Sequence, residues 1–331
     1  MTPFFSIIIP TRDRPETFEK ALTSVVEQSY RDLEVIVIDD GSTAEQRKSM
    51  DRLQAKYDER VKWYQLDRRP RGHGGSFARN TGAAKSKGAY ICMLDDDDQW
   101  TDMEYLSRVH KVIADSDIQV DLHFANQEAY RGDDIVSAAM WIQGLTEIIT
   151  KQNRSPDANG AFDVDVADLL RAGGFCHLNT LVVRRELFDM VGGLDENLRY
   201  EEDRDLFLRV IDVAKTIKYS PAVVSRHNVP DPARQDNVST MVSNIDKHLF
   251  QLHLLAKASL LANDPAIRAY GRRHRAYTLK KIAEELVEAG RARDALNYAL
   301  QGLGAKPTLK WTAYSLLIAL RAVMQRGRKN A

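Results

Sequence analysis

The chain has 331 residues, of which 44% are hydrophobic and 28% charged, and its formal net charge is zero. This composition excludes wholesale disorder, and the length suffices for one large domain or about two, each with a proper core. The charge is unevenly placed, because the chain has 16 Lys/Arg and 6 Asp/Glu from Asp246 onward, whereas the preceding residues have 31 and 41. We therefore expect an acidic front part and a basic tail with different partners.

Cysteine usage and the lack of targeting patterns bear on where the chain works. Cys92 and Cys176 lie in apolar surroundings and lack the spacing of a metal site, so we expect buried thiols in a reducing compartment. The amino terminus shows no secretion signal, and no uncharged apolar run is long enough to span a bilayer. These observations predict a cytoplasmic protein.

The first part of the chain alternates between strand and helix patterns. Residues 4–9 predict a buried strand, and a helix follows, for which Asp13 and Glu16 form a predicted capping pair. Residues 34–38 predict a second buried strand. Strand, helix and strand at this spacing form a βαβ unit, which builds a parallel sheet. The alternation continues with a helix over 44–57 and a strand around 61–66.

A basic, glycine-rich loop is predicted over residues 68–76, before a helix over 78–84. The loop lacks the Lys-Ser/Thr ending of an ATP-binding P-loop. We interpret it as a turn at the flexible edge of a ligand pocket. Contact of its backbone amides with a phosphate is the alternative.

The most distinctive stretch is the apolar run 90–94, which ends in four consecutive carboxylates. The run is long enough for a buried strand and too short for a helix. Because side chains alternate along a strand, we expect Asp95 and Asp97 to point one way and Asp96 and Asp98 the other. Carboxylates crowded in a poorly solvated place repel one another, and Mg²⁺ or Mn²⁺ relieves the repulsion, since both ions prefer oxygen ligands. A solvated acidic turn is the alternative.

The remaining chain is irregular in its middle and helical at its end. Residues 130–172 are polar with weak periodicity, so we interpret them as a loop or lid. Strands are predicted over 118–125 and 179–183, and helices over 185–191, 203–214, 245–262, 267–289, 292–302 and 309–325.

Polar residues follow three of the predicted strands, at 10–12, 39–40 and 95–98. In open α/β sheets, ligands bind outside the carboxyl ends of the strands. The sequence therefore predicts a ligand site at one rim of one sheet.

Five segments occur in a fixed order within residues 5–239. They are SIIIPT at 6–11 with Arg14, VIDDGS at 37–42, ARNTG at 78–82, LDDDD at 94–98, and a block over 183–206 that contains GGLDE and EDRDL. Each segment is weak alone, but the ordered set resembles the inverting family-2 glycosyltransferases of GT-A fold. The resemblance implies a Rossmann-like, mainly parallel α/β sheet flanked by helices, with an α-helical C-terminal extension.

On this resemblance we expect two regions. A GT-A glycosyltransferase domain would cover residues 1–244, with a nucleotide-sugar-binding half over 1–125 and an acceptor half over 126–244. A basic α-helical region would cover 245–331.

The resemblance also implies a site for a nucleotide-sugar donor. Pro10, Thr11 and Arg12 would line the base pocket, Asp40 would accept a hydrogen bond from the base or ribose, Asp96 would lie near the ribose, and Arg79 would contact the diphosphate. Many family members have an aromatic residue in place of Arg12, so the identity of the base stays open. Without a ligand role, Pro10 and Thr11 end a strand, Asp40 belongs to a turn and Arg79 is a surface arginine.

A divalent metal is implied beside the donor. Asp97, supported by Asp95, would hold the metal, which neutralises charge on the departing nucleoside diphosphate. His227 follows a predicted strand and would ligate the metal or contact the diphosphate, with a structural histidine as the alternative. His73 and His177 are interpreted as structural.

Inverting transfer needs a base that takes the proton from the acceptor hydroxyl as this group attacks the anomeric carbon. The resemblance assigns the role to Asp203, with Glu202 as the substitute. Like-charged neighbours and partial burial would raise the pKa of Asp203. The alternative is that these acids interact with the positive end of the following helix.

The last predicted helix combines apolar bulk with aromatic residues and ends before Arg326, Arg328 and Lys329. This pattern is typical of a helix that lies on an anionic membrane, and a helix packed on its neighbours is the alternative. Attachment to the inner leaflet would suit a lipid-linked saccharide acceptor. The basic tail has no groove-reading motif or stacking platform, so no nucleic-acid partner is expected.

Together these features predict a metal-dependent inverting glycosyltransferase of the hexosyltransferase type. It would use Mg²⁺ or Mn²⁺ to move a sugar from a nucleotide-sugar donor to a glycan or lipid-linked saccharide, in cell-surface polysaccharide synthesis. A nucleotidyltransferase acting on sugar phosphates is the first alternative, although it leaves Asp203 without a task. The second is a catalytically silent binding module recruited through its basic tail, against which the carboxylates at three strand ends argue.

Overall fold

The computed structural model describes residues 2–140, 142, 144–229 and 238–329. The chain divides into two compact units, Met1–Ala233 and Arg234–Ala331. The boundary predicted after residue 244 stays a prediction, and each unit is described by itself.

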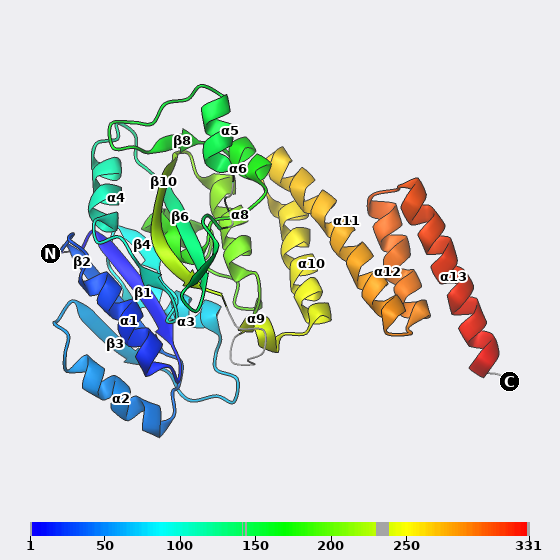
Figure 1. Cartoon of the computed structure of the whole chain (residues 1–331), viewed down its shortest axis with the longest axis horizontal. Helices are drawn as coiled ribbons and strands as arrows, with labels where there is room; N and C mark the ends of the chain where they lie inside the picture. Colours follow the sequence, from blue (N-terminus) through cyan, green and yellow to red (C-terminus); the bar gives the residue numbers. More distant parts are fainter. Residues whose placement is uncertain (1, 141, 143, 230–237, 330–331) are drawn as a thin grey trace. The chain divides into compact units, whose positions relative to one another are not determined.

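The first unit is built on one mixed sheet with strand order β3-β2-β1-β4-β9-β6-β10-β5 (Figure 1). Its first half is parallel and consists of β1 (Phe5–Thr11), β2 (Leu33–Asp39), β3 (Val61–Gln65) and β4 (Tyr90–Met93). Helices α1 (Pro15–Val26), α2 (Ala44–Gln54) and α3 (Gly75–Lys85) connect these strands. The predicted α/β architecture is confirmed, and its parallel part follows from the short βα repeats.

Strand β1 lies at the centre of this half because its residues are apolar on both sides. Ile7, Ile8 and Ile9 are fully buried, as expected for a strand covered on both faces. The predicted capping pair of α1 is wrong, since no side chain caps the helix. Asp13 has a φ of 57°, and its carboxylate instead accepts a hydrogen bond of 2.6 Å from the Thr43 backbone nitrogen. A tertiary contact therefore replaces the local cap.

The second half of the sheet is mixed. Strand β9 (Leu181–Arg184) runs antiparallel to both β4 and β6 (Leu122–Arg131), whereas β6 and β10 (Ile217–Asn228) are parallel. The short strand β5 (Gln99–Trp100) pairs antiparallel with β10. Because β5 follows the four aspartates directly, the turn that carries them is fixed between the ends of β4 and β10.

The prediction of a loop or lid over 130–172 is wrong, because this segment holds regular elements. They are β7 (Asp134–Ser137), α5 (Leu145–Lys151), β8 (Phe162–Val164) and α6 (Val166–Ala172). None exceeds seven residues, which is too short for a periodic pattern to emerge. The other elements of this unit are α4 (Tyr105–Ala114), the 3₁₀ turn η1 (Leu178–Thr180), α7 (Arg185–Met190) and α8 (Glu202–Val213).

The second unit is helical, as predicted. It contains α9 (Val238–Met241), α10 (Asn244–Leu261), α11 (Pro265–Glu288), α12 (Ala292–Ala305) and α13 (Leu309–Lys329). Trp311 of α13 packs in the core with Ile282 and Ile318, and its indole nitrogen donates a 2.9 Å hydrogen bond to the Ala299 carbonyl. Among the described residues of the chain, no helix combines the length and apolar character needed to cross a bilayer.

Candidate active site

The carboxyl ends of β1, β2 and β4 meet at one rim of the sheet, as the sequence predicted. The Thr11 hydroxyl at the end of β1 donates a 2.8 Å hydrogen bond to Asp96 Oδ2 beyond β4. The guanidinium of Arg14 lies 3.4 Å from Asp96 Oδ1 and 3.0 Å from Asp97 Oδ2. Pro10 lies one residue before Thr11 in β1, opposite Ile38 of β2. The segment that follows β1 is therefore bound to the acidic turn, residues 95–98, which follows β4.

The expected alternation of the four aspartates is wrong. Strand β4 ends at Met93, and the chain then turns so that the backbone nitrogen of Asp98 donates to the Asp95 carbonyl at 3.2 Å. As a result, carboxylate oxygens of Asp95, Asp97 and Asp98 lie within 4.8 Å of one another. Side chains alternate only within a strand, and the strand ends at Met93. Asp98 can therefore lie on the same side as Asp95 and Asp97, although strict alternation would place it on the other side.

This crowding has a direct electrostatic consequence. Burial raises the pKa of Asp97 to about 8, the charges of Asp98, Asp96 and Asp95 add to the rise, and Arg14 offsets only part of it. Three carboxylates are a donor set that suits a hard divalent cation such as Mg²⁺ or Mn²⁺. The residues present therefore fit the metal that the sequence predicted.

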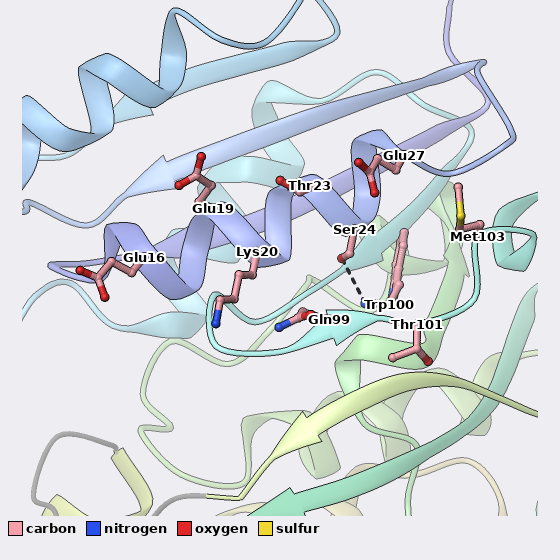
Figure 2. Close-up of a pocket in the computed structure, with 10 residues that line it drawn as sticks. All are labelled: Glu16, Glu19, Lys20, Thr23, Ser24, Glu27, Gln99, Trp100, Thr101 and Met103. Carbon is pink, nitrogen blue, oxygen red and sulfur yellow. Dashed lines mark hydrogen bonds between the residues drawn. The ribbon is translucent and has the colours of Figure 1, made fainter. Parts of the chain in front are cut away.

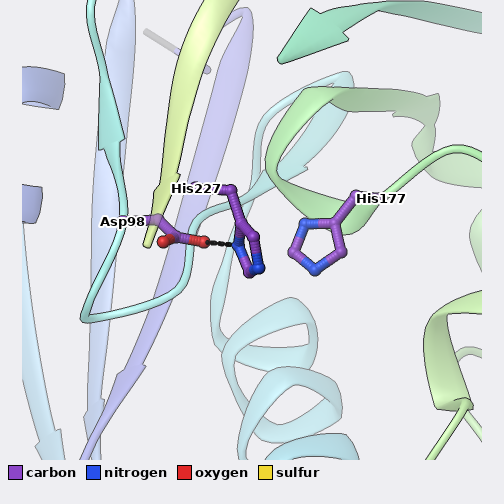
Figure 3. Close-up of side chains that lie close together, drawn as sticks. All are labelled: Asp98, His177 and His227. Carbon is purple, nitrogen blue, oxygen red and sulfur yellow. Dashed lines mark hydrogen bonds and ion pairs between the residues drawn. The ribbon is translucent and has the colours of Figure 1, made fainter. Parts of the chain in front are cut away.

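Asp98 is fully buried, and its two oxygens accept three hydrogen bonds. The donors are His227 Nδ1 at 2.7 Å, the Asn228 backbone nitrogen at 2.7 Å and Asn179 Nδ2 at 2.5 Å. Figure 3 shows the Asp98 carboxylate against the His227 ring, with His177 beside it. The Asp98 carboxylate is held by these three hydrogen bonds and in turn orients His227. Its bond to Nδ1 fixes the orientation of the ring and the tautomer that carries its proton on Nδ1.

His177 is part of this cluster, although the sequence interpretation treated it as structural. Its ring centroid lies 5.2 Å from that of His227, and its Nε2 lies 3.8 Å from Asp95 Oδ2 and 4.0 Å from Asp203 Oδ2. Burial lowers the pKa of His177 to about 4, so the ring is neutral at pH 7. Asp95 and His177 are far apart in sequence, and no spacing pattern links them.

The two histidines differ in charge preference. Burial alone would lower the pKa of His227, but the hydrogen bond to Asp98 and the nearby acidic charges raise it above its ordinary value. The cluster thus contains His227, which favours its protonated form, and His177, which stays neutral.

Arg79 is buried beside the acidic turn and is not a surface residue. Its guanidinium hydrogen-bonds the Asp95 carboxylate, and its NH1 lies 3.7 Å from Glu202 Oε1. Burial would raise the pKa of Asp95, but Arg79 and His177 hold it below the ordinary value. A Cβ at Gly75 would lie 2.5 Å from Arg79 NH1, so a larger residue there would push the guanidinium from its present position.

Asp203 stands in the first turn of α8, and its Oδ2 lies 4.0 Å from the same His177 Nε2 that approaches Asp95. The backbone enters the helix through Glu201, which has a φ of 63°, and Asp203 Oδ1 accepts a 2.7 Å hydrogen bond from the Arg204 nitrogen. Burial raises the pKa of Asp203 to about 8, and the charges of Glu202 and Glu201 contribute. Burial also raises the pKa of Glu202. A carboxylate with this pKa is well suited to accept a proton near neutral pH.

Asp40 and Arg12 hold the glycine-rich loop. The Asp40 carboxylate accepts hydrogen bonds from the backbone nitrogens of His73 and Gly74, at 2.9 and 3.1 Å, and lies 2.7 Å from His73 Nδ1. Arg12 donates a 2.8 Å hydrogen bond to the Arg69 carbonyl. A Cβ at Gly72 would lie 2.3 Å from Arg12 NH1 and 2.4 Å from Asp40 Oδ2, so the loop can approach only as glycine. Any contact of Asp40 with a base stays a prediction.

A groove of about 620 Å³ lies elsewhere, between the outer face of α1 and β5 (Figure 2). Its lining includes Glu16, Lys20 and Met103 but none of the predicted site residues. Trp100 is bound into the structure there, because its backbone nitrogen donates to Ser24 Oγ at 3.1 Å and its indole to the Asn179 carbonyl at 2.7 Å. We assign no ligand to this groove.

The fold and the rim define an α/β protein with an acidic, cation-compatible site of the kind found in nucleotide-sugar-dependent transferases. Residues 6–161 match the model of glycosyl transferase family 2, the family that the sequence resemblance named. The first unit accordingly has the GT-A type of fold, as the sequence resemblance implied.

Curated relatives match over part of their length. A GalNAc(5)-diNAcBac-PP-undecaprenol beta-1,3-glucosyltransferase of Campylobacter jejuni is 36% identical over 97 residues, which are 29% of this chain and 30% of the relative. A PGL/p-HBAD biosynthesis glycosyltransferase of Mycobacterium bovis is 27% identical over 227 residues, 68% of this chain and 77% of the relative. The chain spans about a third of the length of the first curated relatives it matches.

Solved structures show the same fold at low sequence identity. S. aureus TarS 1-349 in complex with UDP-GlcNAc aligns with a TM-score of 0.67 and 17% identity, over 100% of this chain and 92% of that one. The mannosyltransferase PcManGT of Pyrobaculum calidifontis, in complex with GDP-Man and Mn²⁺, aligns with a TM-score of 0.58 and 18% identity, over 98% and 87%.

Proposed function

We propose that this protein is a metal-dependent inverting glycosyltransferase that moves a hexosyl group from a nucleotide sugar to a glycan or lipid-linked saccharide. The observation that carries the proposal is that one nitrogen, His177 Nε2, lies close to a carboxylate of the acidic turn and to Asp203 of α8. Carboxylates of Asp95, Asp97 and Asp98 gather in the acidic turn, and Asp203, with a pKa raised to about 8, lies 4.0 Å from His177 Nε2.

The donor is proposed to bind at the rim of the parallel half-sheet. Thr11 and Asp96 are joined there, and Asp40 with Arg12 holds the glycine-rich loop beside them. The structurally similar TarS and PcManGT are solved in complex with UDP-GlcNAc and GDP-Man, two donors with different bases, so we propose a nucleotide sugar without naming the base.

Asp97 and Asp95, with His227 nearby, are proposed to hold Mg²⁺ or Mn²⁺. When bound, the cation supplies positive charge to the leaving diphosphate. Support comes from the raised pKa of Asp97, which is caused by burial and then by the charges of Asp98, Asp96 and Asp95, and from the Mn²⁺ in the PcManGT complex. Arg79, already bonded to Asp95, brings a permanent positive charge to the same place.

Asp203 is proposed to take the proton from the acceptor hydroxyl while that oxygen attacks the anomeric carbon from the face opposite the diphosphate. The oxygen–carbon bond forms, the carbon–phosphate-oxygen bond breaks with its electron pair, and the proton ends on Asp203. Glu202 is the substitute in this role. His177 Nε2 lies 3.8 Å from Asp95 and 4.0 Å from Asp203, and the low pKa of His177 leaves its ring neutral beside both groups at pH 7.

A lipid-linked or cell-surface acceptor is supported by the relatives. One is named for a PP-undecaprenol substrate, and another, TuaG of Bacillus subtilis, for teichuronic acid biosynthesis, with 33% identity over 98 residues. The proposal therefore has the protein work in the cytoplasm, at the inner face of the membrane, in polysaccharide synthesis.

A donor screen tests the proposal. The protein is incubated with a panel of nucleotide sugars and Mn²⁺ or Mg²⁺, and released nucleoside diphosphate is measured. We expect release with at least one donor, its loss in Asp97→Ala, and retained donor binding without transfer in Asp203→Asn.

Two outcomes would contradict the proposal. Release of pyrophosphate from a nucleoside triphosphate and a sugar phosphate would indicate a nucleotidyltransferase. Normal transfer by Asp203→Asn would remove that residue as the base.

A further inference from the structure

Helix α13 is apolar on two opposite faces. One face is buried in the helical unit through Trp311, Ile318 and Ala322, which are at most 7% exposed. The other face carries large apolar side chains that are 56–92% exposed, namely Leu309, Leu316, Leu317, Leu320, Val323 and Met324. A helix that only packs against its neighbours would be polar on its outer side.

The exposed apolar residues form a continuous stripe. Residues 316, 320 and 323 follow Leu309 by seven, eleven and fourteen positions, which at 3.6 residues per turn brings them all to one side of the helix. Contiguous apolar surface of this kind marks a site of interaction, unlike scattered single residues. We call these six residues the α13 stripe.

The charged residues beside the α13 stripe indicate which kind of surface it binds. Lys310 and Arg321 are exposed, and each follows a stripe residue by one position, so both flank the stripe about 100° around the helix. The sequence of α13 has no acidic residue and adds Arg326, Arg328 and Lys329 near its end. A second copy of the helix would offer only further positive charges and no acidic partner for them. An anionic bilayer, apolar inside and negatively charged at its surface, is complementary to both features.

We propose that α13 docks flat on an anionic lipid surface, with the α13 stripe in the acyl boundary and Lys310 and Arg321 at the headgroups. The inference deepens the proposed function, on which it rests for its purpose, by naming the surface that would bring the enzyme to a lipid-linked acceptor. The binding itself needs no sugar nucleotide, so it is tested without one.

Vesicle flotation of the full chain provides the test. We expect it to float with vesicles of phosphatidylcholine and about 30% phosphatidylglycerol but not with phosphatidylcholine alone. Leu316→Gln/Leu320→Gln should lower the bound fraction at least about tenfold, because both leucines lose their place in the acyl boundary. Lys310→Gln/Arg321→Gln should also weaken binding, and about 0.5 M NaCl should weaken wild-type binding to the same extent.

The matched control is Leu260→Gln/Leu261→Gln, which removes two leucines at the end of α10 that are 77% and 73% exposed, somewhat more than Leu316 and Leu320. It should float as wild type does, and every variant should keep the wild-type Tm because the changed side chains are exposed. The proposal is overturned if the chain does not float, if it floats equally with neutral vesicles, or if the control loses binding as the α13 variant does. It is also overturned if light scattering finds a dimer that Leu316→Gln/Leu320→Gln dissociates, since the stripe would then be a self-interface.

Discussion

The buried arginine at the start of α3 is the residue whose removal should disturb the candidate site most. Arg79 is 7% exposed, its guanidinium bonds Asp95, and Glu202 lies 3.7 Å away. Arg79→Met keeps most of the side-chain volume and deletes the charge. Asp95 and Glu202, whose side chains are only 23% and 22% exposed, then lose their counter-charge, and the rest of the acidic turn stays beside them.

The magnitude follows from this geometry. Removing one partner of a buried ion pair costs about 3–5 kcal/mol, because the other charge stays buried and unpaired. For a unit the size of residues 1–233, each kcal/mol lowers Tm by about 2–4 °C. We therefore expect Arg79→Met to unfold roughly 6–20 °C below wild type at pH 7 in EDTA, measured by circular dichroism.

The pH dependence of this difference has a defined sign. The pKa of Asp95 in the folded protein lies below its ordinary value of 3.8, so its contribution to stability is present above pH 3.8 and is lost as pH falls through the folded-state pKa. In Arg79→Met that contribution is missing, so the gap in Tm should narrow below about pH 4. Added Mn²⁺ should restore part of the loss at pH 7 by supplying charge to the same carboxylates.

Arg52→Met is the control, because Arg52 is exposed on α2 and its loss should change stability by no more than about 0.5 kcal/mol. If Arg79→Met and Arg52→Met had the same Tm, Arg79 would not be compensating the buried acids.

Three further changes probe the same cluster. Asp97→Asn should raise Tm by a few °C at pH 7–8 in EDTA and should abolish Mn²⁺ binding in calorimetry. The pKa of Asp97 is raised from 3.8 to about 8 by folding, so the wild-type protein loses stability as pH rises from 3.8 towards 8, and the amide variant does not. An unchanged Tm would contradict the raised pKa. Asp98→Asn should weaken Mn²⁺ binding about 10–100-fold and change the ¹⁵N shifts of the His227 ring, and unaltered shifts would mean that Asp98 does not orient it. The transfer rate should rise with pH through about 8 as Asp203 loses its proton, and a flat profile in wild type would argue against Asp203 as the base.

The sequence by itself determined which residues stand at the ends of which strands. A βαβ repeat brings successive carboxyl ends to one rim, so residues 10–12 and 95–98 were expected at the same rim, where Thr11 and Asp96 are hydrogen-bonded. The helices of the second unit were likewise predictable from a 3.6-residue period sustained over many turns. In both cases the information is local and repeats along the chain.

Tertiary structure alone decided how the acidic cluster is completed. Asp98 turns away from the strand pattern because β5 pairs with β10, which brings His227 to it, and the antiparallel insertion of β9 carries His177 and Asn179 to the same place. In α13, the sequence contains every apolar residue, but only packing separates Trp311 and Ile318 from the exposed leucines. Periodicity records a residue's neighbours within one element, whereas burial and charge at a site depend on contacts between elements far apart in the chain.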